Sequence, residues 1–193
     1  MLINIFLILS AYLLGSISAA ILVCKVLGLP DPRTGGSGNP GTTNVMRLHG
    51  KTAAFLTLTG DVFKGIIPVL LAKVIVGSEF IIALSGLAAF LGHIFPIYFK
   101  FKGGKGVATL IGILLATHWL LGLAYIITWI LTAVIFRYSS LAALIATLSI
   151  PFYTYFLEQN FQYTVSFSMI AVILFWRHKS NIYNLLNSKE RKI

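Results

Sequence analysis

The sequence is poor in charge, and above all in acidic residues. Only 10% of its 193 residues are charged, and Asp and Glu together number 5. A soluble domain carries about 25% charged residues, so this scarcity excludes an ordinary soluble fold. The chain has a single cysteine, Cys24. This excludes an intrachain disulfide and a multi-cysteine metal site, and Cys24, within an apolar run, is expected to be a buried and inert thiol.

Long apolar runs dominate what is present. Hydrophobic residues make up 58% of the chain, and the mean hydropathy is +0.90. A membrane helix needs about 20 apolar residues. The N-terminal run has no preceding basic residues and exceeds a signal-peptide core in length, so we interpret it as a retained span. The sequence predicts an all-α integral membrane protein, a single polytopic domain over residues 1–193, with candidate spans at 2–26, 53–76, 79–99, 139–157 and 162–177.

The uncharged run from Val107 to Phe136 contains 30 residues and can be interpreted as one helix or two. One helix of that length would measure roughly 45 Å, which exceeds a hydrocarbon core of about 30 Å. Two helices would be short and would meet near His118 and Trp119. Length alone leaves both interpretations open.

The distribution of Lys and Arg decides between them, because cytoplasmic loops of membrane proteins are enriched in these residues. With two helices and the N-terminus outside, 13 of the 15 cations lie on one side. With one helix, Arg137 and the basic C-terminal tail would move outside. We therefore predict seven transmembrane helices, with the N-terminus outside and the C-terminus cytoplasmic. The helix near 107–117 is expected to be half-inserted and packed against its neighbours.

Two charged residues fall inside the predicted second span. Asp61 and Lys64 are three residues apart and share a helix face. Charges at this depth are costly, usually face the bundle interior and are usually paired. Two interpretations stay open, an ion pair that only locks helices together and a supporting role beside a functional site. The four-residue spacing of Ala11, Gly15 and Ala19 predicts close helix packing.

Residues 35–44, GGSGNPGTTN, separate two apolar segments. Their G-x-G-x-x-G pattern lacks the strand context of a dinucleotide site, and Thr42 follows the last glycine where a P-loop has Lys. The glycines allow backbone N–H groups to form an anion-binding nest. Neutral donors and a guanidinium accompany them. We predict an anion site rather than a flexible linker, formed by this loop with Ser37, Asn39, Gly41, Thr42, Thr43, Asn44 and Arg47.

A second polar segment, GGKG at 103–106, directly precedes an apolar run. A helix N-terminus has free N–H groups and a partial positive charge, glycines allow close approach, and Lys105 adds a full charge. The alternative is an ordinary turn with positive-inside lysines, an interpretation that suits Lys100 and Lys102. His93, near a helix end, can be structural or part of a site.

A third segment, RHKSNI at 177–182, ends the last apolar run. His178 and Asn181 share a face if helical, and His is the usual general base near neutral pH. Arg177 either anchors the membrane edge beside Trp176 or joins the site. RYSSL at 137–141 adds a cation and two hydroxyls, including that of Ser140, at another inner helix end.

In the predicted topology all these segments reach the cytoplasmic face. They combine cations, hydroxyls and glycine turns and contain no Asp or Glu. This composition predicts a site for one or two phosphate groups at the membrane surface and argues against a metal. It also argues against nucleic acid, because few basic residues lie outside short loops. A transporter of phosphorylated metabolites is the main alternative, although transporters usually hold their site at mid-membrane.

The strings SGNPGTTN (37–44), GGKGVAT (103–109) and RHKSNI (177–182) closely resemble signature segments of the bacterial acyl-phosphate:glycerol-3-phosphate acyltransferase family. RYSSL and GDVFKG (60–65) also resemble family segments, and the likeness spans nearly the whole chain. It implies transfer of a fatty acyl group from acyl phosphate to the 1-hydroxyl of glycerol 3-phosphate. The products are lysophosphatidic acid and inorganic phosphate, in the first step of phospholipid synthesis. The resemblance implies no cofactor, a functional monomer among membrane lipids, and a bacterial inner membrane location with the site on the cytoplasmic side.

The resemblance also implies roles for individual residues. We expect catalytic roles for His178, Asn181, Lys105 and Ser37. The proton of the attacking hydroxyl needs an acceptor, which is either His178 or the donor's own phosphate; in the second case His178 orients the hydroxyl. The acyl chain is expected to lie among the apolar helices. We expect phosphate or substrate binding by Asn39, Gly41, Thr42, Thr43, Asn44, Arg47, Gly103, Gly104, Gly106, Thr109, Ser140 and Arg177.

Overall fold

The computed structural model describes residues 1–193 and contains helices and loops but no strand. The all-α prediction is therefore confirmed. Two 3-10 turns, η1 (Pro32–Thr34) and η2 (Ile97–Phe99), lie in the loops. The α-helices are α1 (Leu2–Gly15), α2 (Ala19–Val26), α3 (Thr42–Ile75), α4 (Glu79–Ile94), α5 (Val107–Thr117), α6 (Trp119–Phe136), α7 (Ser139–Leu157), α8 (Phe161–Arg177) and α9 (Lys179–Leu186).

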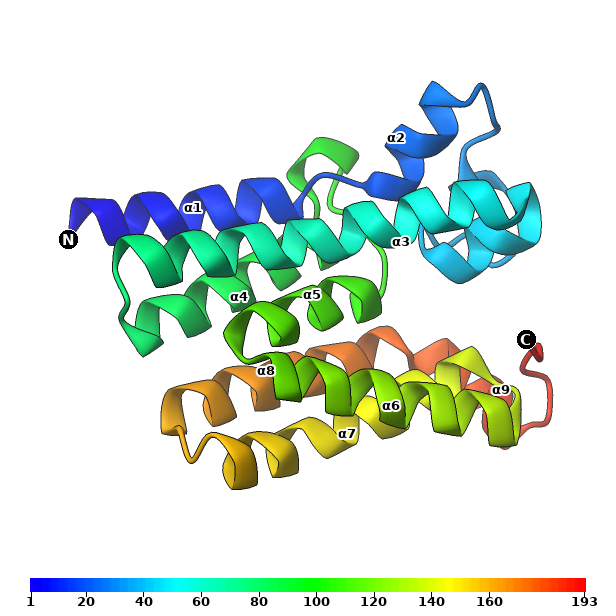
Figure 1. Cartoon of the computed structure of the whole chain (residues 1–193). Helices are drawn as coiled ribbons and strands as arrows, with labels where there is room; N and C mark the ends of the chain where they lie inside the picture. The colour runs from blue at the N-terminus through cyan, green and yellow to red at the C-terminus, as the bar shows by residue number, and fades with distance from the viewer.

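The helices pack in two groups, with α1, α3, α4 and α5 in one and α6, α7 and α8 in the other (Figure 1). The two chain termini lie at opposite ends of the bundle. Phe90, Leu114 and Ile170 are fully buried where the groups meet. Large apolar side chains also cover the outside, including Val134 and Val172, as expected of helices that face lipid.

The number of helices long and apolar enough to cross a membrane is 4, and it becomes 5 if α1 and α2 count as one span bent by 48°. α5 has 11 residues and α8 has 17. These two are shorter than a typical span of about 20 residues. The fold is thus that of an all-helical membrane protein with 4 or 5 candidate spans, and the seven crossings stay a prediction.

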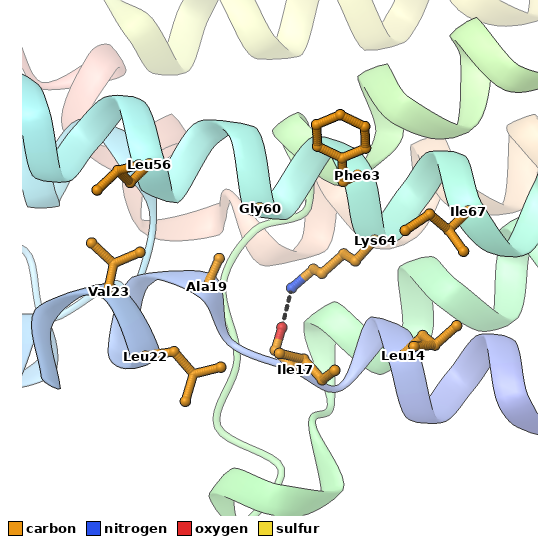
Figure 2. Close-up of a pocket in the computed structure, with 10 residues that line it drawn as sticks. All are labelled: Leu14, Ile17, Ala19, Leu22, Val23, Leu56, Gly60, Phe63, Lys64 and Ile67. Carbon is orange, nitrogen blue, oxygen red and sulfur yellow. Dashed lines mark hydrogen bonds between the residues drawn. The ribbon is translucent and has the colours of Figure 1, made fainter. Parts of the chain in front are cut away.

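The predicted span over residues 2–26 is not one straight helix, because the chain breaks at residues 16–18 between α1 and α2, and the two helices form one span only as a bent pair. A break in a membrane helix frees carbonyls that need new donors. Lys64 Nζ on α3 donates to the carbonyl of Ile17 at 2.7 Å (Figure 2). The same ammonium is 2.8 Å from Asp61 Oδ1. Lys64 thus stabilises the break, although it borders an otherwise apolar cavity of about 330 Å³.

α3 begins 11 residues before the predicted span at 53–76. Gly50, with φ 86° and ψ −175°, kinks it and separates a polar first segment from the apolar remainder. Only glycine adopts such a conformation without strain. The polar segment carries Thr42, Thr43, Asn44 and Arg47. The prediction that these residues belong to a loop is therefore wrong, because hydropathy marks only the apolar part of the helix.

The division of residues 107–136 into two helices is confirmed. α5 and α6 meet at His118, whose extended backbone ends the first helix, and α5 has the predicted bounds of the short helix. Leu110 and Ile113 on α5 are almost fully buried, so protein covers this helix. A Cβ at Gly112 would strike the α3 backbone at Val62. α5 can pack this closely only because the position has no side chain.

α4 ends at Ile94, five residues before the end of the predicted 79–99 span. Pro96 has no backbone N–H and disfavours a helical residue before it, so the helix ends here. The close packing predicted for residues 11–19 is confirmed. Ala11 is fully buried, and a Cβ at Gly15 would meet the α4 backbone at Ala89.

Candidate active site

The glycine turn, residues 103–106, is held in place by Arg177 at the end of α8. Arg177 Nη2 donates to the carbonyl of Gly103 at 2.9 Å, and Nε donates to that of Gly104 at 3.2 Å. Arg177 also lies over the Trp176 ring, 5.8 Å from its centroid. Arg177 therefore fixes the turn, while its roles as a membrane-edge anchor and in substrate binding stay predictions.

His93 packs against the other side of the glycine turn. Its carbonyl accepts from the Gly104 N–H at 3.3 Å. A Cβ at Gly104 would overlap the His93 ring, and a Cβ at Gly103 would overlap the His93 carbonyl. Glycine is thus required at both positions by close approach, and the backbone path of the turn is set by its contacts on both sides.

Lys105, in the same turn, contacts Asn181 on α9. Lys105 Nζ donates to Asn181 Oδ1, and Asn181 Nδ2 donates to Glu190 Oε1 at 2.7 Å. The same carboxylate oxygen accepts from Ser140 Oγ at 2.7 Å. The first turn of α7, the glycine turn, α9 and the C-terminal tail therefore converge through one chain of hydrogen bonds.

The expectation that the cluster contains no Asp or Glu is wrong, because Glu190 lies within it. The tail after α9 folds back, and the N–H of Ile193 donates to the Arg137 carbonyl at 2.8 Å. This return brings the carboxylate beside Lys105, where it supplies a negative charge among several cations. No signal in the sequence separated Glu190 from the other polar residues of a basic tail.

His178 occupies the junction between α8 and α9 and is 3% exposed. Its Nδ1 lies 2.9 Å from the Leu174 carbonyl, so the tautomer that fits carries the proton on Nδ1 and leaves Nε2 as an acceptor. Burial lowers the pKa of His178 to about 4, and the nearby Lys105 and Arg177 charges act in the same direction. The imidazole is therefore neutral near pH 7.

Lys105 itself is half-buried, and this burial lowers the pKa of its ammonium. The Glu190 carboxylate opposes the shift, while Arg177 and Arg47 add to it. A cation that has lost part of its hydration gains more from an anionic ligand than an exposed one does. The electrostatics of this position therefore favour an anionic ligand.

Asn44 organises the first polar loop from inside. Its Nδ2 donates to the carbonyls of Pro32 (2.8 Å) and Gly35 (3.2 Å), and its Oδ1 accepts from the Ser37 N–H at 2.9 Å. The Gly38 and Gly41 N–H groups also bond within the loop. In this structure Asn44 holds the loop together, and substrate binding by Asn44 and by the loop nest stays a prediction.

Arg47 and Thr43 connect this part of the chain to the cluster. Arg47 Nη2 donates to the carbonyls of Arg191 and Lys192 at 3.4 Å, and Thr43 Oγ1 is 3.2 Å from Ser139 Oγ. The structure gives the exposed Ser37 side chain no contact with Lys105 or His178.

The remaining predicted site residues lie outside the chain of hydrogen bonds that joins Lys105, Asn181, Glu190 and Ser140. The Thr42 hydroxyl is buried without a partner. Asn39 lies against Gly41. Gly106, with φ 89°, precedes α5. Thr109 is fully buried, and its hydroxyl lies 3.2 Å from His93 Nδ1. No group of three His, Cys, Asp or Glu side chains is placed to hold a metal.

The fold is that of an integral membrane protein, and cations, hydroxyls, an amide and one carboxylate meet in a single cluster. Comparison with known proteins identifies the family. Residues 5–188 match the family model described as glycerol-3-phosphate acyltransferase. This chain belongs to the glycerol-3-phosphate acyltransferase family, as the sequence resemblance had indicated.

Curated relatives support the assignment. Glycerol-3-phosphate acyltransferases of Francisella tularensis subsp. novicida and Francisella philomiragia are each 53% identical to the chain over 190 residues, covering 98% of it and 93% of the relative.

Two crystal structures of PlsY (YgiH), an integral membrane glycerol 3-phosphate acyltransferase, share the fold. The glycerol 3-phosphate form has a TM-score of 0.94 at 37% identity, and the lysophosphatidic acid form has 0.93 at 36%. Each match covers 98% of this chain and 95% of the other.

Replacing Glu190 with Ala is expected to loosen the cluster, because Ser140 and Asn181 then lose their common acceptor. Hydrogen bonds to a charged group contribute about 2 kcal/mol, which corresponds to a fall of about 4–8 °C in Tm for a chain of this size. The change in Tm is measured by thermal unfolding in detergent. The Tm of Glu190→Gln, which keeps an acceptor oxygen, should fall less, and the Tm of the control variant Lys189→Ala, at an exposed neighbouring position, should not change. Equal midpoints for Glu190→Ala and Lys189→Ala would contradict the structural role of Glu190.

Proposed function

We propose that this protein transfers a fatty acyl group from acyl phosphate to the 1-hydroxyl of glycerol 3-phosphate, releasing lysophosphatidic acid and inorganic phosphate. The observation that carries the proposal is the convergence of Lys105, Asn181, Ser140 and the Arg177-held glycine turn. This cluster suits phosphate, which is common to both substrates. The names of the relatives support glycerol 3-phosphate as the acceptor.

The two phosphates are assigned to different parts of the cluster. The glycine turn and Lys105 bind glycerol 3-phosphate, because a turn at a helix N-terminus offers free N–H groups and a positive charge. Arg47 and the first polar loop, including Ser37, Asn39 and Thr42, bind the donor phosphate. Arg47 lies close enough to affect Lys105 electrostatically, so the two phosphates would be neighbours.

The reaction needs orientation and charge neutralisation rather than a covalent intermediate, because acyl phosphate is already activated. The oxygen of the 1-hydroxyl attacks the acyl carbon, the bond from that carbon to the phosphate oxygen breaks, and the released phosphate keeps the electron pair. Cations at the leaving group stabilise the charge that develops on it. Arg47 acts in this way on the donor phosphate, and Lys105 assists it from the neighbouring acceptor site, so both cations lower the barrier without changing their own bonding.

The donor phosphate is the proton acceptor, and His178 orients the hydroxyl. A buried imidazole with a pKa of about 4 is a weak base. A phosphate, whose second pKa is about 6, binds the proton more strongly. The neutral Nε2 of His178 can still accept a hydrogen bond from the hydroxyl and align it. Asn181, held between Lys105 and Glu190, is placed to help in this alignment.

The same proposal includes the topology, the oligomeric state and the location of the protein. The chain is one polytopic domain that works as a monomer in a bacterial inner membrane, with seven crossings and its site on the cytoplasmic side. The opposite positions of the two termini in Figure 1 suit an odd number of crossings. The acyl chain lies among the apolar helices and enters from the bilayer. Neither substrate requires a cofactor.

Cysteine accessibility tests the topology, because the only native thiol, Cys24, is buried. A cysteine placed at Ile193 should react with an impermeant maleimide only after the cells are opened, and one placed at Gln159 should react in intact cells. Wild-type protein, with Cys24 alone, is the control for background labelling. Labelling of both sites from the same side would overturn the seven-span arrangement.

Turnover of purified protein with palmitoyl phosphate and glycerol 3-phosphate, without added metal, tests the reaction. We expect lysophosphatidic acid and inorganic phosphate to appear in equal amounts. Lys105→Ala should lower kcat/KM by at least about 100-fold, because charge stabilisation at the reacting centre is lost. The matched control is Lys102→Ala, an exposed lysine of the same loop, with near wild-type turnover. Absence of both products would favour a carrier, which flux across sealed vesicles would reveal.

The pH dependence of kcat tests the role of His178. Because its pKa is lowered to about 4, the ring stays neutral as pH falls from 8 to about 5 and becomes protonated only below that range. A loss of activity centred near pH 6 should therefore arise from substrate phosphates and persist in His178→Gln. If that limb disappears in His178→Gln, His178 is the base. Near-full turnover of His178→Ala would exclude both roles.

A further inference from the structure

Three polar side chains buried between α3 and α4 take no part in the proposed chemistry. The side chains of Asp61, Lys64 and His93 are 3%, 7% and 6% exposed. Asp61 Oδ1 lies 2.8 Å from Lys64 Nζ and 3.7 Å from His93 Nδ1. Buried charges are costly, and an ion pair that only joins helices can often be replaced by apolar packing without loss of stability. These three residues make contacts on two sides, with the glycine turn and with the break between α1 and α2.

On one side the group reaches the glycine turn. The His93 ring occupies the space that a Cβ at Gly104 would fill, and the His93 carbonyl accepts from the Gly104 N–H. His93 Nδ1 is also 3.2 Å from the Thr109 hydroxyl, on the first turn of α5. The orientation of one imidazole thus sets the approach of the turn and the start of the helix that follows Lys105.

On the other side the group reaches the break between α1 and α2. Lys64 Nζ donates to the Ile17 carbonyl at 2.7 Å (Figure 2). The same ammonium also contacts Asp61. Lys64 fixes the position of the Asp61 carboxylate, and Asp61 faces His93 Nδ1. At 3.7 Å the carboxylate is beyond hydrogen-bond distance and acts on the ring through its charge, while the Thr109 hydroxyl lies 3.2 Å from the same nitrogen.

We propose that Asp61, Lys64 and His93 are positioning residues that hold the phosphate-binding turn at 103–106 in its binding geometry from the membrane side. Arg177 holds the same turn from α8, so the turn is clamped between two elements. The proposal rests on the proposed function only in assigning phosphate binding to the turn. Its central observable, the order of the turn, can be measured without substrate.

The test compares amide hydrogen exchange in wild type and in Asp61→Asn/Lys64→Gln. This neutral pair keeps similar shapes and a donor for the Ile17 carbonyl, but removes the carboxylate that faces His93. We expect the peptide containing Gly103–Gly106 to exchange at least about tenfold faster, because its local opening becomes easier. Peptides from α6 and α7 should exchange at the wild-type rate. Tyr125→Phe, which removes a buried hydroxyl contact with Thr147, is the matched control.

Kinetics give a second readout. KM for glycerol 3-phosphate should rise at least about tenfold in the double variant, with kcat changed less than about threefold. His93→Gln should have the same effect, and adding it to the double variant should cause little further change, since all three residues act through the ring. The single variant His93→Gln also tests the proposal if the double variant does not fold.

Wild-type exchange at the turn in both Asp61→Asn/Lys64→Gln and His93→Gln would overturn the proposal. So would faster exchange spread equally over all helices, because that marks general destabilisation. A wild-type protein that fails to use acyl phosphate would instead refute the proposed function. The exchange comparison would still decide whether these residues order the turn.

Discussion

The contact between Arg177 and the carbonyls of Gly103 and Gly104 is the interaction on which the site depends. It joins the end of α8 to the turn before α5, two segments far apart in the sequence. Once they are joined, His178 and Asn181 follow directly after the arginine and come to lie beside Lys105. A bidentate guanidinium suits this role, because its planar set of donors fixes the direction as well as the distance.

The membrane imposes a second constraint, since backbone groups freed by a helix break need partners within the protein. The break after α1 is stabilised by Lys64, which donates to the Ile17 carbonyl. At the junction of α5 and α6, Lys73 Nζ donates to the Thr117 carbonyl at 3.1 Å. The kink at Gly50 instead directs the first part of α3 toward the tail, where Arg47 meets it. The polar residues within this apolar chain therefore follow the irregularities of its helices.

Charge in the cluster is mixed rather than uniformly positive. Glu190 returns on the tail to bind Ser140 and Asn181, so the cations do not face one another without a counter-charge. Burial keeps His178 neutral among them. A phosphate entering such a site meets ordered donors and partly desolvated cations, which is where electrostatic stabilisation is strongest. In the proposed reaction this arrangement would serve both phosphorylated substrates.

Some features could be predicted from the sequence because they depend on local hydropathy and spacing. These include the all-α membrane class, the end of α5 at Thr117 and the bounds of α7. The family resemblance also rested on short local strings. The break after Gly15, the polar start of α3 and the place of Glu190 were decided by tertiary structure. Each depends on contacts between segments distant in the chain, namely Lys64 with the Ile17 carbonyl, Arg47 with the tail, and Glu190 with Ser140. Hydropathy describes how a segment meets the membrane, but only packing determines which polar groups meet one another.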